Sequence, residues 1–299
     1  MDYKIILDLI PLEVAHSTIN ALYRKKSLSL STLSLDDHDF YNNQYAVLSA
    51  GQQSALCKVD LDKKEVLVIN SKEIEFQGVK PRDARQVCMM EGIKNYPLFV
   101  ALGGAGTGKT TLALSYAVQQ KFRNDKRIVL CKPTTFVGNK SNAIAAIPGD
   151  HRDKMSGYID SYLCAITRIL GDYAEHHVAE WEQDGSLEFK PLELMRGMHF
   201  EDCVVILDEA QNTTPHELLT LLSRVADTSS LIILGDDLQI DLGIPFSQTG
   251  LGTLIHSHSF FDSDVCAGIA LKAQYRGVLA DFAIDVLTEI RDQNEPDDY

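Results

Sequence analysis

The segment GGAGTGKTT, residues 103–111, directly follows the apolar run PLFVAL at positions 97–102. It fits the pattern G-x-x-x-x-G-K-[ST], with Gly103, Gly108, Lys109 and Thr110 at the defined positions. Glycines let backbone N–H groups turn inward around a polyphosphate, because they carry no Cβ atom that would clash. A helix that begins at this turn adds the positive end of its dipole. The pattern therefore predicts a strand, a phosphate-binding loop and a helix in succession.

This loop also assigns expected roles to single residues. Lys109 is expected to reach the β- and γ-phosphates of a nucleoside triphosphate, and the Thr110 hydroxyl is expected to ligate Mg²⁺. A tight turn with a purely structural purpose is the alternative interpretation. The expected nucleotide-binding residues are Gly103, Gly104, Ala105, Gly106, Thr107, Gly108, Lys109, Thr110 and Thr111.

A pair of acids, Asp208 and Glu209, follows the apolar run CVVIL at positions 203–207. Ligands of open α/β sheets bind beyond the carboxyl ends of the strands, so this pair is expected to face the same cleft as the glycine turn. Asp208 is the expected partner of Mg²⁺, and Glu209 is expected to orient and deprotonate an attacking water. An exposed acid pair at a helix start is the alternative, since acids favour that end of the helix dipole.

A second polar segment, GDDLQ, follows the apolar run at 230–234. It is expected to bring Asp236 and Gln239 to the same cleft, where Gln239 would contact a γ-phosphate and report its loss. Ordinary hydrogen bonding within a loop is the alternative for both side chains.

The pattern of elements predicts an α/β protein with a parallel sheet whose two faces are covered by helices. We expect a small β-rich N-terminal module at 1–78, a main domain at 79–292 and an acidic tail at 293–299. Module strands are predicted at 44–48, 54–59 and 65–69, with a helix at 15–23 and another strand formed by the SLSLSTLSL segment at 27–35. Further main-domain strands are predicted at 127–131, 203–207, 230–234 and 265–271, and helices at 110–122, 157–170, 174–184 and 279–291.

Composition limits the setting and the partners. The six cysteines are scattered without a C-x-x-C pair, and no apolar run is long enough to span a membrane. With no signal-peptide pattern at its start, the chain is expected in the cytoplasm. Its net charge of −14 repels nucleic acid at long range, so contact with RNA or DNA requires a local basic patch.

The segments GGAGTGKT, RIVLCKPTT, IPGD, LMRG, VVILDEAQNTTP and ILGDDLQIDL, in this order, resemble the PhoH-like family of P-loop ATPases. The resemblance covers roughly residues 78–292. This family is related to superfamily 1 helicase cores, so the resemblance implies a RecA-like fold, ATP hydrolysis and involvement of RNA or DNA. It also implies ring-shaped homo-oligomers, of which we favour a hexamer. Some members carry an N-terminal PIN nuclease domain; residues 1–78 are too short for one, so nuclease activity is not expected.

The resemblance further implies that Gln86, in VKPRDARQ, binds adenine. The alternative is a polar residue on a helix that packs against the strand. Because only one RecA-like lobe is visible, a neighbouring subunit is expected to supply an arginine to the γ-phosphate. Arg276 in QYRG is favoured, followed by Arg224 in LLSRV and then Arg196 in LMRG.

Two classes of function remain open. One is an ATP-driven, helicase-like motor on single-stranded RNA or DNA, and the other is a P-loop kinase or signalling ATPase that acts on a small molecule or a protein. A motor needs loops that contact the strand, with cations for the phosphates and an aromatic ring for stacking. The expected channel-loop residues are Lys132, Phe136, Lys140, Arg152 and Lys154. His176 and His177 are expected on an exposed helix face.

Overall fold

The computed structural model describes residues 7–33, 35, 40–133, 151–275, 282 and 286, without the side chains of 151–158. Several expected features lie outside the described residues: Arg276, the channel-loop residues Phe136 and Lys140, the side chains of Arg152 and Lys154, and most of the predicted helix at 279–291. The tail at 293–299 lies outside them as well. No helix in the described part of the chain is both long and apolar enough to cross a membrane.

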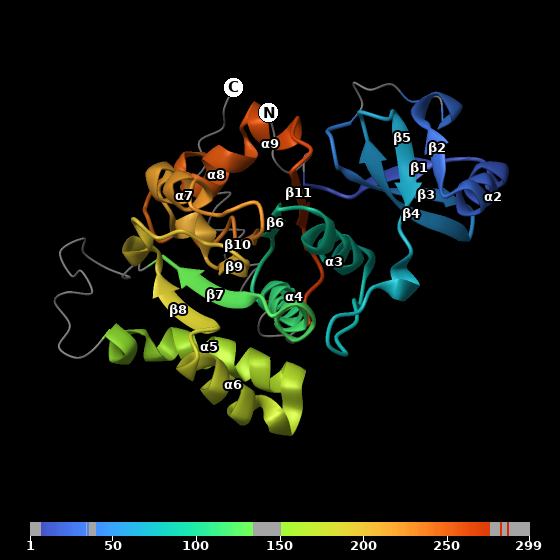
Figure 1. Ribbon diagram of the computed structural model, residues 1–299. Coiled ribbons are helices and arrows are strands. Elements are labelled where there is room, and N and C mark those ends of the chain that lie inside the picture. The colour runs from blue at the N-terminus through green and yellow to red at the C-terminus, as the bar shows by residue number, and fades with distance from the viewer. Residues whose placement is uncertain are drawn as a thin grey trace.

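A six-stranded sheet forms the body of the molecule (Figure 1). Its strands run in the order β11-β6-β10-β9-β7-β8, and every neighbouring pair is parallel. This arrangement confirms the predicted parallel sheet and is consistent with a RecA-like P-loop fold. The strands are β6 (Leu98–Leu102), β7 (Arg127–Lys132), β8 (Leu187–Pro191), β9 (Cys203–Leu207), β10 (Ser230–Gly235) and β11 (Cys266–Ala270). β8 was not predicted from the sequence, and it is only partly buried at the edge of the sheet.

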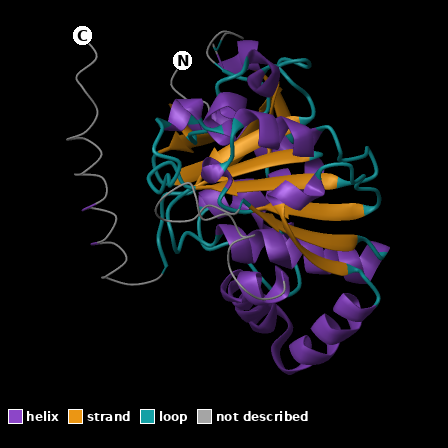
Figure 2. Cartoon of the chain, turned by 90° about the vertical axis from the view of Figure 1, so that its left-hand side faces the viewer, coloured by secondary structure: helices purple, strands orange, loops and turns teal. Residues whose placement is uncertain are grey.

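Helices cover both faces of this sheet (Figure 2). Alternate residues of each strand point to opposite faces, so Phe99 and Ala101 join one hydrophobic cluster while Leu98 and Val100 join another. The first cluster contains residues of α3 (Ala84–Asn95), α4 (Lys109–Asn124), α5 (His151–Leu170) and α6 (Ala174–Gln183). The second contains residues of α7 (Pro215–Leu222), α8 (Gly250–Ile255) and α9 (His258–Phe261). Short 3₁₀ helices lie at Gly171–Tyr173, Leu192–Met195, Ala210–Asn212 and Phe246–Gln248.

The N-terminal residues form a second sheet of five strands, in the order β1-β3-β4-β5-β2. β1 pairs with β3 in parallel and the other pairs are antiparallel. Helix α2 (His16–Lys25) packs on this sheet. A 3₁₀ turn at Ser71–Glu73 comes after the last strand of the sheet in the chain. The strands are β1 (Ile10–Glu13), β2 (Ser27–Ser29), β3 (Tyr45–Ala50), β4 (Gln53–Asp60) and β5 (Glu65–Val68). The three predicted module strands correspond to β3, β4 and β5, whereas β1 was not predicted.

The Ser/Leu-rich segment is not one continuous strand, and that prediction was wrong beyond Ser29. Its first three residues form β2, and Leu30–Leu33 form a 3₁₀ helix. The physical reason is the length of the partner strand: Ser29 pairs with Glu65, the first residue of β5, so no strand remains to pair with later residues. Leu30 instead turns into the core of the module, where it is buried.

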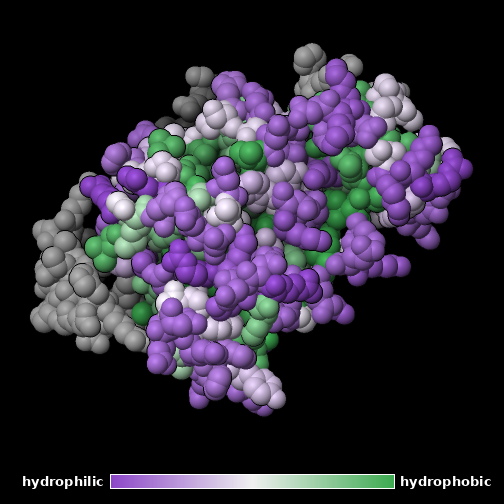
Figure 3. Space-filling view, in the orientation of Figure 1, coloured by the Kyte–Doolittle hydropathy of each residue, from purple (hydrophilic) through white to green (hydrophobic). Residues whose placement is uncertain are grey.

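Polar contacts join the two sheets. The Asp8 carboxylate forms ion pairs with Arg85 on α3 and, at 3.1 Å, with Lys272 after β11. Burial disfavours the charged form of Asp8, but these hydrogen bonds outweigh that cost and lower the pKa of its carboxyl group. Tyr45 Oη donates to Glu91 Oε2 of α3 at 2.8 Å. The face seen in Figure 3 is mostly hydrophilic, with hydrophobic residues gathered where the small sheet meets the larger body.

Gly252 offers a test of the packing beneath the site, since α8 contacts the turn at Ala210–Asn212. A Cβ atom at position 252 would lie 1.8 Å from the backbone carbonyl oxygen of Phe246, which has no side-chain freedom to move away. We expect Gly252→Ala to lower the free energy of unfolding by about 3 kcal/mol in denaturant titrations. Thr253→Ala, at the exposed next position, is the control and should change it by less than about 0.5 kcal/mol. Equal stability of the two variants would contradict the packing described.

Candidate active site

The glycine turn lies between β6 and α4, as the sequence predicted. Gly103, Gly106 and Gly108 have φ values of 153°, 86° and 91°, in the region that side chains with a Cβ rarely adopt. A Cβ at Gly103 would also lie 2.6 Å from the carbonyl oxygen of Leu271. One at Gly108 would lie 2.9 Å from Nε2 of Gln86. The backbone of the loop therefore requires glycine at these positions.

Lys109 and Thr110, the first two residues of α4, point their polar atoms toward the loop and the acid pair. Lys109 Nζ donates to the carbonyl oxygens of Gly103 and Gly104, the latter at 3.0 Å. Thr110 Oγ1 donates to Asp208 Oδ2 at 3.2 Å. Residues 98 positions apart in the sequence thus meet because β6 and β9 end at the same edge of the sheet.

The donor set at Thr110 and Asp208 fits a hard divalent cation, which prefers hydroxyl and carboxylate oxygens. Burial and the neighbouring charge of Glu209 raise the pKa of Asp208, while the charges of Lys109 and Lys132 oppose that shift. The carboxylate is therefore short of compensating positive charge, and a bound cation would supply it.

A cavity of about 730 Å³ opens above these residues, which is within the usual range for a cofactor or drug-sized ligand. It brings together most of the residues expected from the sequence. Those that line it are Gln86, Ala105, Gly106, Thr107, Gly108, Lys109, Thr110, Thr111, Asp208, Glu209, Asp236 and Gln239. Gly103 and Gly104 instead line a second cavity, of about 280 Å³.

Gln211 connects the acid pair to the loop after β10. This side chain is fully buried, and its Nε2 donates to Glu209 Oε2 at 2.7 Å and to the carbonyl oxygen of Gln239 at 3.0 Å. Its Oε1 accepts from the backbone N–H of Asp236 at 3.0 Å. Beside it, Asn212 exchanges two hydrogen bonds with Asp241, at 2.7 and 3.1 Å. The carboxylate of Glu209 and the segment 236–241 are therefore held as one unit.

Gln86 lies in the first turn of α3 and is buried. Its Nε2 donates to the carbonyl oxygen of Thr107 at 2.9 Å, and its Oε1 accepts from the backbone N–H of Arg82 at 2.8 Å. The structure is compatible with both interpretations of Gln86, the adenine ligand and the polar helix residue, because Gln86 lies buried on a helix and also lines the cavity. Its role toward adenine stays a prediction.

Tyr275 and Arg168 also line the cavity, although the sequence did not predict either as a site residue. Tyr275 donates from its backbone N–H to the carbonyl oxygen of Gly106 at 3.1 Å, and its ring lies 4.9 Å from the guanidinium carbon of Arg82. Arg168 lines the cavity from the last turn of α5 and forms no hydrogen bond or ion pair with the described residues. Tyr275 is the second residue of the QYRG segment, so the sequence carried a signal for it, whereas no motif marks Arg168.

Two of the arginines expected as a donated finger, Arg224 and Arg196, lie away from the cavity. Arg224 and Arg196 are exposed and do not line the cavity. Arg224 follows α7, and its carbonyl oxygen accepts from Phe200, shortly before β9 begins, so it lies at the opposite end of the strands from the glycine turn. Arg276, the favoured candidate, is outside the described residues.

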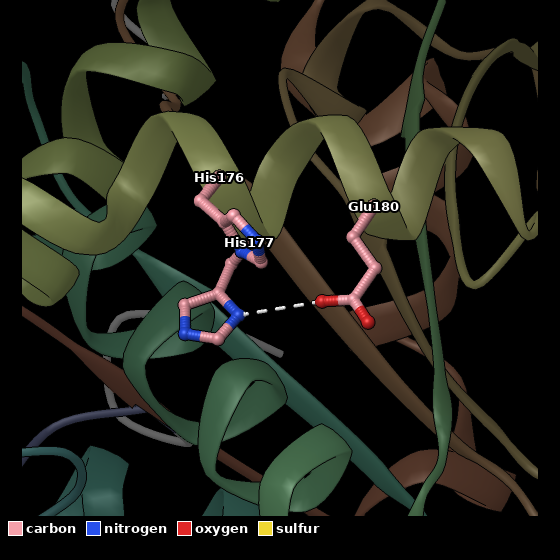
Figure 4. Close-up of side chains that lie close together, drawn as sticks. All are labelled: His176, His177 and Glu180. Atoms are coloured by element: carbon pink, nitrogen blue, oxygen red, sulfur yellow. Dashed lines mark ion pairs between the residues drawn. The ribbon is translucent and has the colours of Figure 1, made fainter.

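His176, His177 and Glu180 on α6 form a cluster of potential metal ligands within 4.8 Å of one another (Figure 4). His177 Nδ1 lies 3.7 Å from Glu180 Oε2. The expectation of an exposed face holds for His176, whereas His177 is partly buried: its ring stacks on Trp181 at 5.3 Å and meets the edge of Phe122. His177 is part of the packing between α4 and α6.

The parallel sheet, the glycine turn and the acid pair together define a P-loop nucleotide-binding protein. A family model described as PhoH-like protein matches residues 78–274. The chain belongs to the PhoH family. The family and the site together support nucleotide hydrolysis, and a divalent metal is typical of such sites.

Relatives of known name agree with this assignment. The chain is 27% identical to protein PhoH2 of Bacillus subtilis over 92% of this chain and 63% of that protein. It is 29% identical to protein PhoH of Escherichia coli over 76% of this chain and 74% of that protein. It is 35% identical to a PhoH-like protein of Bacillus subtilis over 58% of this chain and 52% of that protein.

Among solved structures, Pif1 helicase from Candida albicans is similar at 18% identity and a TM-score of 0.37, over 74% of this chain and 46% of that chain. This likeness is too remote to add to the fold described above. The chain spans 63% and 52% of the two Bacillus subtilis relatives, so what those proteins do as wholes comes to this chain only as a proposal.

Proposed function

We propose that this chain hydrolyses ATP in the 730 Å³ cavity and acts as one subunit of a ring-shaped motor on single-stranded RNA or DNA. The observation that carries the proposal is the meeting of Lys109, Thr110, Asp208 and Glu209 around one cavity. These residues come from two different strand ends, and together they supply the groups that phosphoryl transfer to water requires.

The loop N–H groups and Lys109 bind the phosphates, and the role proposed for Gln86, which lines the same cavity, is contact with the base. Thr110 and Asp208 would hold Mg²⁺, which supplies positive charge to the phosphate oxygens. Glu209 accepts a proton from the attacking water as the water oxygen bonds to the γ-phosphorus and the bond to the β-phosphate oxygen breaks. Inorganic phosphate and ADP are the products. Gln239 contacts the γ-phosphate. Because the backbone carbonyl oxygen of Gln239 accepts a hydrogen bond from Gln211, loss of the γ-phosphate is passed on to Gln211 through this bond.

A ring follows from the openness of the site. A single lobe leaves the γ-phosphate exposed to bulk water, and an arginine donated by a neighbour can raise the rate about 10³–10⁵-fold. A hexamer is the assembly we favour. Mass measurement of the assembled particle with and without ATP and Mg²⁺ tests this, and a particle that stays monomeric throughout would contradict it.

Arg276 is proposed as the donated arginine. Arg276→Ala is expected to reduce ATP turnover at least about a thousandfold while the Kd for ATP stays nearly unchanged, because the residue acts on the neighbour's nucleotide. Phosphate release and nucleotide titration measure the two quantities. Arg224→Ala is the matched comparison, because Arg224 is the second candidate. Its ATP turnover should stay nearly unchanged if Arg276 is the donated arginine. Loss of ATP binding by Arg276→Ala would remove Arg276 from this role.

Phosphate release with and without polynucleotide tests the motor directly. We expect single-stranded RNA or DNA to raise the rate, because a motor couples strand contact to hydrolysis. A rate that neither polymer changes would favour the alternative class, a kinase or signalling ATPase. Transfer of labelled γ-phosphate to an added small molecule or protein would then identify that alternative.

A further inference from the structure

Lys132 stands beside the proposed catalytic base. It is the last residue of β7, the strand that pairs with β9, and the backbone N–H of Asp208 donates to the carbonyl oxygen of Cys131 at 2.9 Å. This register carries the Lys132 side chain toward the acid pair. Its Nζ lies 3.6 Å from Oε1 of Glu209, and the two side chains are 21% and 38% exposed.

The two carboxylate oxygens of Glu209 have partners of different kinds. Oε2 accepts from Gln211, which is buried and held by two further hydrogen bonds to Asp236 and Gln239. Oε1 faces the ammonium of Lys132. Gln211 cannot leave without unpairing buried backbone groups, whereas the Lys132 ammonium is carried on a flexible four-carbon stem. Oε1 is therefore the oxygen that water must reach, and Lys132 competes for it.

We propose that Lys132 restrains Glu209 in the resting protein, and that a backbone phosphate of a bound single-stranded polynucleotide draws Lys132 away and frees the base. The inference rests on the proposed function and deepens it, since it names how strand binding would accelerate hydrolysis.

The location of Lys132 favours a polynucleotide over the nucleotide itself as the anion. Lys132 does not line the 730 Å³ cavity, whereas Lys109 does. With a net charge of −14, the chain attracts a polyanion only where cations are local, and Lys132 is one such cation at this edge.

The closing experiment is a double-mutant cycle on polynucleotide binding, measured without hydrolysis. The affinity for fluorescein-labelled oligouridylate is determined for the unaltered protein, Glu209→Gln, Lys132→Gln and the double variant. Because coupling is reciprocal, removing the charge of Glu209 should weaken the hold on Lys132 and tighten binding by about fivefold. In the Lys132→Gln background the same change should have no effect. Lys132→Arg, which keeps the charge, should retain the response.

Each other outcome overturns the inference. If Glu209→Gln tightened oligouridylate binding equally in the unaltered protein and in Lys132→Gln, Glu209 would act only through the overall negative charge of the protein. No tightening in either, or no binding of oligouridylate at all, would mean that Lys132 is not withheld from a strand.

Hydrolysis supplies an independent readout. Lys132→Gln should raise phosphate release in the absence of polynucleotide by about fivefold and lower the stimulation by oligouridylate, because the base is already free. A basal rate at or below that of the unaltered protein would overturn the restraint. If the unaltered protein and Lys132→Gln both release no phosphate while the binding cycle behaves as expected, then the proposed ATPase fails and the coupling of Lys132 to Glu209 stands.

Discussion

Replacing Lys109 with alanine is expected to weaken ATP binding by about a hundredfold, or about 3 kcal/mol. The ammonium group already lies within the loop, where it donates to the carbonyl oxygens of Gly103 and Gly104. Its transfer to the phosphates would exchange neutral acceptors for charged ones, and hydrogen bonds to charged groups are the stronger kind. Titration with a fluorescent ATP analogue measures the effect.

Two matched variants distinguish phosphate binding by Lys109 from a non-specific effect of removing a positive charge. Lys121→Ala removes a lysine from the other end of α4, where its ammonium pairs with Asp125, and should leave the Kd for ATP unchanged. Lys109→Arg keeps the charge but changes its geometry, and should recover only part of the affinity. An unaltered Kd in Lys109→Ala would remove the phosphate role from this residue and with it the basis of the proposed site.

Glu209→Gln is expected to lower ATP turnover by about 10²–10⁴-fold without weakening nucleotide binding. The glutamine keeps the size of the side chain and an oxygen that can accept from Gln211, so the buried unit with segment 236–241 should persist. What is lost is the group that takes the proton of the attacking water. Phosphate release under single-turnover conditions, with the Kd for ATP determined in parallel, measures this separation.

The control for this variant lies at the other end of the same strand. Glu201→Gln neutralises an exposed acid before β9, whereas Glu209 follows that strand, and it should leave turnover unchanged. Turnover that survives in Glu209→Gln would exclude Glu209 as the base. A loss of nucleotide binding would instead show that the residue supports the cavity.

The local motifs were readable because their chemistry depends on neighbours in the chain. The glycines around Lys109 must be adjacent for the loop to form, and the strand before them and the helix after them appear as an apolar run and an amphipathic run. Asp208 and Glu209 follow a fully apolar segment, so their place at the carboxyl edge of a parallel sheet follows from the general architecture of such folds. At the start of α7, Thr214 forms a capping box with Glu217.

Other features had no local signal. The strand β8 is only partly buried and lacks the apolar run that marks the central strands. The segment after Ser27 alternates like a strand but ends early, because the length of its partner β5 decides how far it pairs. His177 lies in a polar stretch, and its contact with Trp181 and Phe122 depends on the packing of α6 against α4.

The sequence by itself determined which groups are present at the site: the phosphate loop with Lys109 and Thr110, and the acids at the end of an apolar strand. Only the tertiary structure decided which of their atoms are engaged. Gln211 holds one oxygen of Glu209 and Lys132 approaches the other, and Arg168 enters the cavity from a helix far along the chain. The physical reason is that motif chemistry follows from short-range spacing, whereas these contacts depend on the order and register of strands that are distant in sequence.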